Sequence, residues 1–140
     1  MYSSVLVPVD LDEPSSWAGA VPAGLALARC FGARITLGTI VPDSLATREA
    51  QWSGIGYRRL LDTAAARLAS LAEELRGDAE LATRVGSGPI ARGILDLAQS
   101  VEADLIVLSS HRPEMKDWLI GAQAARVVRH ARCSVMVVRD

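Results

Sequence analysis

The chain has too few cysteines for a disulfide framework or a cysteine-rich zinc site. Its two cysteines, Cys30 and Cys133, lie far apart in the sequence and form no CxxC pair, the spacing that such sites commonly use. We therefore expect neither kind of cross-link. We predict instead that both side chains are small apolar residues of the core.

Long apolar runs and blocks of like charge are also missing from the sequence. No apolar stretch reaches the ~18 residues that a transmembrane helix needs. The first ten residues, MYSSVLVPVD, lack the charged and long apolar regions of a signal peptide. The net charge is −1, with no basic block or tail, which argues against a nucleic-acid partner. We expect a cytoplasmic protein without a membrane span.

The composition is that of a chain with a real hydrophobic core. Of its 140 residues, half are apolar and 22% are charged, as is typical of a soluble globular protein. No internal repeat, low-complexity tract or linker interrupts the sequence. We predict a single domain that covers residues 1–140.

Apolar runs typical of strands alternate with segments of helical periodicity along the whole chain. The predicted strands are residues 4–10, 33–41, 80–86, 103–110 and 133–140. The predicted helices are residues 12–32, 57–75, 87–101 and 118–131, with a loop at 42–54. This alternation predicts an α/β fold, a five-stranded parallel sheet with helices on both faces.

Two features of the helices can be checked directly. Pro22 falls inside the first predicted helix and predicts either a bend or a shifted start, and Gly32 is expected to end that helix.

Trp52 and Tyr57 flank the predicted loop 42–54. We interpret both as partly buried against the sheet rather than as cover for a bound base.

Polar loops follow the predicted strands, and one of them resembles an anion site. In open parallel sheets, ligands bind beyond the carboxyl ends of the strands, where the strand order reverses. After the fourth strand, Ser109 and Ser110 can donate hydroxyl hydrogen bonds, and His111 can donate or accept one. Arg112 carries a guanidinium group that suits phosphate.

The start of the last predicted helix completes this loop. Gly121 would let the backbone approach a ligand closely, and free N–H groups at a helix start favour anions. The residues alone leave two interpretations open. The stretch is either a cradle for an anion or an ordinary polar turn, in which Arg112 pairs with Glu114 or Asp117.

Four stretches, taken in order, resemble the universal stress protein family. They are VLVPVD, GSGP before ILDLA, ADLIVLSS, and the ending GAQAARVVRHARCSVMVVR. Residues 110–113, Ser-His-Arg-Pro, are similar to one subgroup of that family, in which some proteins accompany TRAP-type solute transporters. The resemblance implies a homodimer that pairs through the C-terminal strand. It also implies binding of ATP, with or without Mg²⁺, or of AMP or another adenine nucleotide, and a transporter or regulatory protein as a partner.

The resemblance also implies a set of nucleotide-binding residues. They are Pro8, Val9, Asp10, Ile40, Ser109, Ser110, His111, Arg112, Gly121, Ala122 and Gln123. Asp10 would lie near the adenine or ribose, and Ile40 would contact adenine. From the residues alone, Asp10 could instead be a carboxylate favoured by a helix dipole, and Ile40 could be plain core.

The sequence departs from the pattern G-x2-G-x9-G-(S/T) of the ATP-binding members. Ser109 and Arg112 stand where the two early glycines would be, the spacer before Gly121 is one residue short, and Ala122 replaces the final Ser/Thr. Two functions therefore stay open. One is a nucleotide-binding regulatory or stress-response homodimer. The other is a nucleotide-free dimeric interaction module, in which Arg112 occupies the site.

Other function classes fit the residues less well. The first strand is followed by DLDEPSS rather than by the GxGxxG of a dinucleotide dehydrogenase. A phosphoacceptor domain would need an acidic residue after the third strand and a lysine after the fifth, where residues 84–86 and Arg139 stand. No paired carboxylates, Ser-His-Asp arrangement or metal cluster marks an efficient enzyme. We expect no enzyme, with slow ATP hydrolysis left open.

Overall fold

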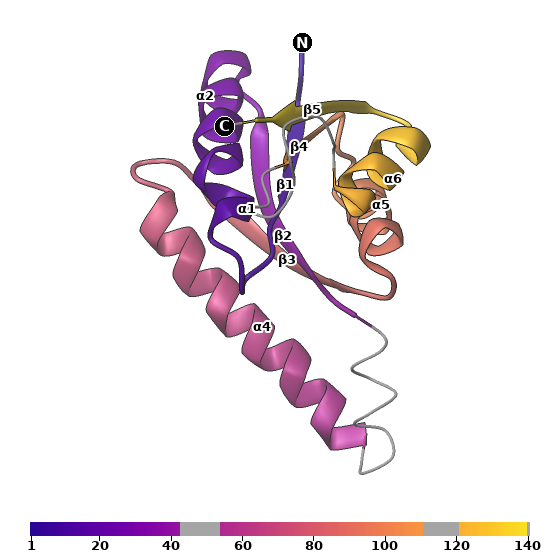
Figure 1. Cartoon of the computed structure of the whole chain (residues 1–140). Coiled ribbons are helices and arrows are strands. Elements are labelled where there is room, and N and C mark those ends of the chain that lie inside the picture. The colour runs from indigo at the N-terminus through magenta and orange to yellow at the C-terminus, as the bar shows by residue number, and fades with distance from the viewer. Residues whose placement is uncertain (43–53, 111–120, 140) are drawn as a thin grey trace.

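Five parallel strands form one sheet in the computed structural model, which describes residues 1–42, 54–110 and 121–139 (Figure 1). The strands are β1 (Ser4–Pro8), β2 (Arg34–Val41), β3 (Leu81–Ser87), β4 (Leu105–Ser109) and β5 (Ser134–Val138). Their order in the sheet is β3-β2-β1-β4-β5, and every neighbouring pair is parallel. The predicted fold class is confirmed.

Helices cover both faces of this sheet. They are α1 (Ser15–Ala18), α2 (Ala20–Phe31), α4 (Gly54–Leu75), α5 (Ile90–Ser100) and α6 (Ala122–His130). Figure 1 shows α1, α2 and α4 on one side of the sheet and α5 and α6 on the other. Alternate residues of β1 serve the two faces: Val5 and Val7 pack in the core under α2 and α4, and Leu6 packs in the core under α5 and α6.

Hydrogen bonds hold the central strand β1 at both of its ends. At the start of the strand, the Asp104 carboxylate accepts hydrogen bonds from the backbone N–H groups of Ser3 and Ser4 at 2.9–3.1 Å. The bonds from Ser4 and then Ser3 lower the pKa of Asp104, because they stabilise its charged form. Past the other end, Thr39 Oγ1 donates to the carbonyl oxygen of Val9 at 2.9 Å. These contacts fix the position of β1 in the sheet and therefore the position of the residues that follow it.

The first predicted helix differs from the prediction, because residues 12–32 form two helices. The short α1 ends at Ala18, and α2 begins after Gly19. Pro22 lies in the first turn of α2, where its missing N–H would have had no helical partner. The prediction of a shifted start is thereby confirmed. Gly32 ends α2 with a φ of 66°, and its N–H donates to the carbonyl oxygen of Ala28, as expected for a C-terminal glycine.

The cysteines only half follow the prediction. Cys133 is partly buried, and burial and then the Asp104 charge raise the pKa of its thiol. Cys30 is exposed, so its assignment to the core was wrong. It lies near the end of α2, where the helix turns this position away from the sheet. Among the described residues, no helix is both long and apolar enough to cross a bilayer.

Candidate functional site

The strand order reverses at β1, and this places the candidate site. From β1 the chain passes to β2 and then to β3 on one side of β1, and it then crosses to β4 and β5 on the other side. The connections that follow β1 and β4 therefore leave toward opposite faces, and a crevice is expected between the carboxyl ends of these two strands. Nine of the eleven predicted site residues belong to the described chain, and these nine come from the segments at this edge. The other two, His111 and Arg112, lie outside the described residues.

Three adjacent strands present apolar side chains side by side on the face under α5 and α6. Pro8 lies two residues after Leu6 and so shares its face. Leu108 belongs to the same core, and Ile40 packs against it. The register that pairs Leu6 with Ile106 brings Leu108 level with Pro8. Leu108 was not among the site residues predicted from the sequence. Every second residue of a strand lies on the same face, so counting back two positions from the predicted Ser110 would have identified it.

Glycines on β3 and α5 hold Ile40 in place. A Cβ atom built on Gly86 would lie 2.8 Å from Ile40 Cδ1, and one built on Gly93 would lie 2.9 Å from both Cδ1 and Cγ2 of Ile40. Ile40 itself remains partly exposed. Its side chain is therefore a packing residue that still offers apolar surface at the edge of the sheet. The two interpretations of Ile40 are compatible.

Asp10 sits in a loop that its own backbone and Ser16 shape. The Asp10 carboxylate accepts a hydrogen bond from the N–H of Asp12 at 3.0 Å. The N–H of Asp10 donates to Ser16 Oγ at 2.8 Å, and Ser16 Oγ donates to the carbonyl oxygen of Asp10. Because α1 begins only at Ser15, Asp10 is not in its first turn. The carboxylate is exposed beyond the carboxyl end of β1 and can still accept further hydrogen bonds.

Arg67 of α4 anchors the loop that carries Asp10 through hydrogen bonds. Its Nη2 donates to the carbonyl oxygen of Leu11 and to Asp12 Oδ1, both at 3.0 Å. The side chains of Arg67 and Asp12 are 50% and 83% exposed, so water screens the pair and its contribution to stability is small. We infer that Arg67 orders the loop rather than stabilising the whole fold. Nothing in the sequence marked this residue.

The serines after β4 are already hydrogen-bonded within the protein. Ser109 Oγ donates to the carbonyl oxygen of Ser15 at 3.0 Å, which ties β4 to α1. The N–H of Ser110 donates to the carbonyl oxygen of Val138 at 3.1 Å, and its hydroxyl contact with the same oxygen is long, at 3.5 Å. A hydroxyl has one proton to donate. Ser110 can therefore turn its proton to a ligand more readily than Ser109 can.

The start of α6 completes the described part of the site. Gly121 is the N-cap residue of this nine-residue helix, and no side chain caps it there. The first N–H groups of a helix have no partner within the helix, and the helix dipole there favours negative charge. No atom of the described residues lies within 4 Å of a Cβ built on Gly121. Ala122 is exposed beside it, and Gln123 is partly buried.

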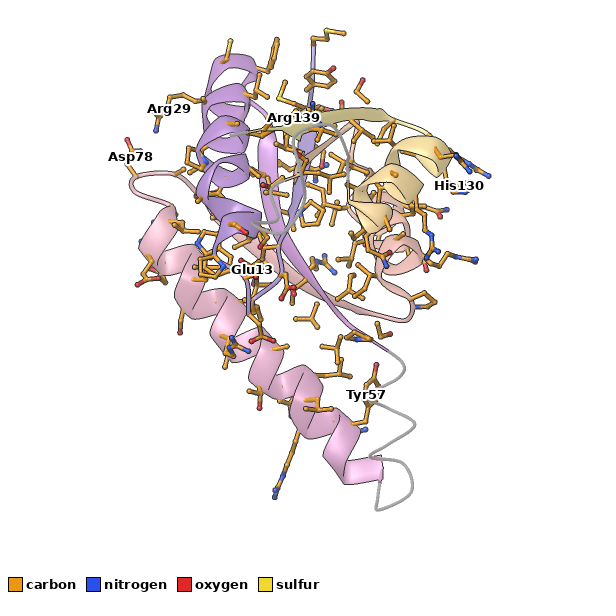
Figure 2. All side chains as sticks on the ribbon, viewed as in Figure 1. Glu13, Arg29, Tyr57, Asp78, His130 and Arg139 are labelled. Carbon is orange, nitrogen blue, oxygen red and sulfur yellow. The ribbon has the colours of Figure 1, made fainter. Side chains whose placement is uncertain are left out.

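Two buried polar atoms in the described chain have no hydrogen-bond partner. They are Tyr57 Oη and Gln123 Oε1. Figure 2 shows Tyr57 extending from the start of α4 back toward the sheet, and it is half-buried, as the sequence predicted. Trp52 lies outside the described residues. Unpaired buried polar groups cost roughly 1–3 kcal/mol each unless water or a ligand satisfies them. Their position was not predictable from the sequence, because tertiary packing buries them.

Known proteins are similar to this chain in sequence and in fold over nearly its whole length. Residues 1–139 match the model of the universal stress protein family. Universal stress protein G of Salmonella typhimurium is 28% identical over 99% of this chain and 100% of its own length. The universal stress protein of Archaeoglobus fulgidus, solved in complex with dAMP, is 19% identical and superposes with a TM-score of 0.63 over 97% of each chain. Another universal stress protein, solved in complex with cAMP, is 23% identical and has a TM-score of 0.63 over 99% of this chain and 97% of its own. By sequence and by fold, the chain belongs to the universal stress protein family.

Proposed function

We propose that this protein binds an adenine nucleotide in the crevice at the carboxyl ends of β1, β2 and β4. One observation carries the proposal. The partly exposed side chain of Ile40, which packs against the same core as the buried Leu108, lies at the same edge as the exposed Asp10 carboxylate and the N–H groups at the start of α6, which no side chain caps. A planar base fits the apolar surface, ribose hydroxyls can donate to Asp10, and phosphate fits the helix start.

The remaining predicted site residues fit the same ligand. Val9 follows β1 and shapes the approach to Asp10, and Ser110 and Gln123 flank the phosphate position. Arg112 would add positive charge to a site whose Ala122 offers no hydroxyl. The proposed ligand is ATP, with or without Mg²⁺, or AMP or another adenine nucleotide. Structural neighbours solved with dAMP and cAMP support an adenine nucleotide.

We infer a regulatory or stress-response role rather than efficient catalysis. In the described part of the site, Asp10 is the one titratable side chain, and general acid–base catalysis commonly needs a matched pair. The protein would work in the cytoplasm as a homodimer with a single domain over residues 1–140. A solute transporter or a regulatory protein would be its partner, as for some proteins of the subgroup that residues 110–113 resemble.

One second function has an observation in its favour. Ser109 stands where ATP-binding members have an early glycine, and its hydroxyl donates a hydrogen bond to the carbonyl oxygen of Ser15. Ala122 has no hydroxyl to donate to phosphate. Both features suit a nucleotide-free interaction module with the same fold, in which Arg112 fills the crevice. The two functions differ in whether the folded protein binds nucleotide.

Thermal unfolding with and without Mg-ATP or AMP separates these functions. A ligand at 100 times its Kd stabilises the folded state by ~2.7 kcal/mol, which raises the Tm by roughly ten degrees for a chain of this size. We expect such a rise in Tm for the wild type with adenine nucleotides and a smaller rise for Asp10→Ala. The control Asp62→Ala, at an exposed position on α4, should show the same rise as the wild type. If protein freed of carried nucleotide is folded and gives no shift, the interaction module is the correct function.

The loop contact of Arg67 gives a second prediction. Arg67→Ala should weaken nucleotide binding several-fold, because the loop that carries Asp10 loses its anchor on α4. The Tm without nucleotide should change little, since exposed ion pairs contribute ~0–1 kcal/mol. Titration calorimetry measures the first effect and thermal unfolding the second. Arg58→Ala, at an exposed position on the same helix, is the matched control. Unchanged affinity would show that the loop keeps its shape without Arg67.

A further inference from the structure

A groove runs between α5 and α6 on the outer face of the molecule. Its volume is about 1100 Å³. Apolar side chains form its floor, which reaches the sheet at the fully buried Ile106; they include Ile90, Leu95, Ala98 and Ala103. The α5 helix beside it has 11 residues and is roughly 16 Å long, about three turns of a helix.

Basic side chains that form no ion pair with any described residue line the α6 side of this groove. Arg126, His130 and Arg132 line the groove, and Arg129 lies beside them on α6. All four are exposed, and no described carboxylate lies within ion-pair distance of any of them. Figure 2 shows His130 at the outer end of α6, pointing away from the sheet.

The helix dipole accounts for only part of this cluster. Arg129 and His130 lie in the last turn of α6, where positive charge is favourable. Arg126 lies a full turn earlier, and Arg132 lies beyond the end of the helix. These two arginines face the groove without a structural partner among the described residues. An external partner would explain their position.

The α5 side of the groove differs in charge. Asp96 and Glu102 line it, and Asp96 forms a loose, exposed ion pair with Arg92 at 3.5 Å. A nucleic-acid backbone or an anionic membrane would bring negative charge against both sides. A peptide can instead place acidic residues on one flank and apolar residues on the floor.

We propose that this groove docks an acidic amphipathic segment of a partner protein. The segment lays its apolar face on Leu95, Ala98 and Ile106 and its carboxylates beside Arg126 and Arg132. This is helix-in-groove recognition with a charged rim that fixes orientation. The groove shares Gln123 with the proposed nucleotide site, but the proposal does not depend on nucleotide binding.

The test uses a synthetic 14-residue peptide with leucines at i, i+3, i+4 and i+7 spacing and glutamates on one flank. Fluorescence anisotropy should give saturable binding to the full chain. The double variant Arg126→Glu with Arg132→Glu should weaken binding by about ten-fold or more, because both charges change sign. The matched double variant Arg58→Glu with Arg59→Glu changes net charge equally on exposed positions of α4. It should change affinity less than about two-fold.

A peptide of the same composition without an amphipathic face separates docking from simple charge attraction, and it should bind much more weakly. Several outcomes would overturn the proposal: no saturable binding, equal losses in the two double variants, or equal binding of the scrambled peptide. Tighter binding of single-stranded DNA or of phosphatidylserine vesicles, lost in the same groove variant, would assign the cluster to that partner instead. Thermal unfolding of each variant verifies that it is folded.

Discussion

Replacing Gly93 by valine is expected to lower the free energy of unfolding by roughly 3 kcal/mol, near the upper end for overpacking a core. A Cβ at this position would lie 2.9 Å from two atoms of Ile40 and 3.0 Å from the carbonyl oxygen of Ser87. Ile40 could rotate, but the backbone oxygen of β3 cannot move without the strand. The gain in helix propensity over glycine is below ~1 kcal/mol and cannot offset this.

Chemical denaturation measures the effect, and Gln99→Val is the matched control. Gln99 is exposed on the same helix, so valine there carries the β-branched cost without the clash. Its effect should stay within about 0.5 kcal/mol. Gly93→Val should also weaken nucleotide binding, because it displaces Ile40 from the base position. A variant as stable as the wild type would mean that α5 can shift away from β2 freely.

Gly93 also illustrates what the sequence can and cannot predict about this fold. The five strands, their parallel arrangement and the end of α2 at Gly32 follow from local patterns: apolar runs, helical spacing and a terminal glycine. The close approach of Gly93 to Ile40 joins residues more than fifty positions apart. The break of the first helix at Gly19 is similar, because long-range contacts such as that of Ser109 with Ser15 hold α1.

The site was predictable in its location but not in its detail. Strand ends and polar loops point to the edge at which Asp10, Ile40 and Gly121 lie. The sequence did not reveal that Arg67 anchors the Asp10 loop from α4. This contact joins two elements more than fifty residues apart in the chain, and local spacing carries no information about it.

Met136→Asp is expected to convert the proposed homodimer into a monomer. Among the described strands, β5 is at the edge of the sheet and pairs with β4 alone, so no described strand covers the other side of its backbone. Met136 is the middle residue of β5 and is 39% exposed, although it is apolar. Uncovered apolar edge strands are prone to pairing, and a two-fold axis would pair two such edges at once. Light scattering should give twice the 14.9 kDa chain mass for the wild type.

The two-fold arrangement makes the effect of this change large. Antiparallel pairing about the middle of β5 sets the two copies of residue 136 opposite each other, at about 5 Å. Two carboxylates at that distance repel, and we expect dimerisation to weaken by about thirty-fold or more, or ~2 kcal/mol. Val128→Asp, at a 45% exposed position on α6 away from the edge, should leave the dimer intact.

Mixing two variants separates this repulsion from a general loss of folding. Met136→Asp and Met136→Lys should each be monomeric alone, because like charges face each other across the axis. Mixed in equal amounts, they should form a heterodimer, since the same geometry then sets opposite charges together. If each variant stays dimeric alone, β5 is not the interface. If the mixture stays monomeric while both variants unfold at the wild-type temperature, the two copies of Met136 do not face each other across the axis, and the proposed register of β5 pairing is wrong.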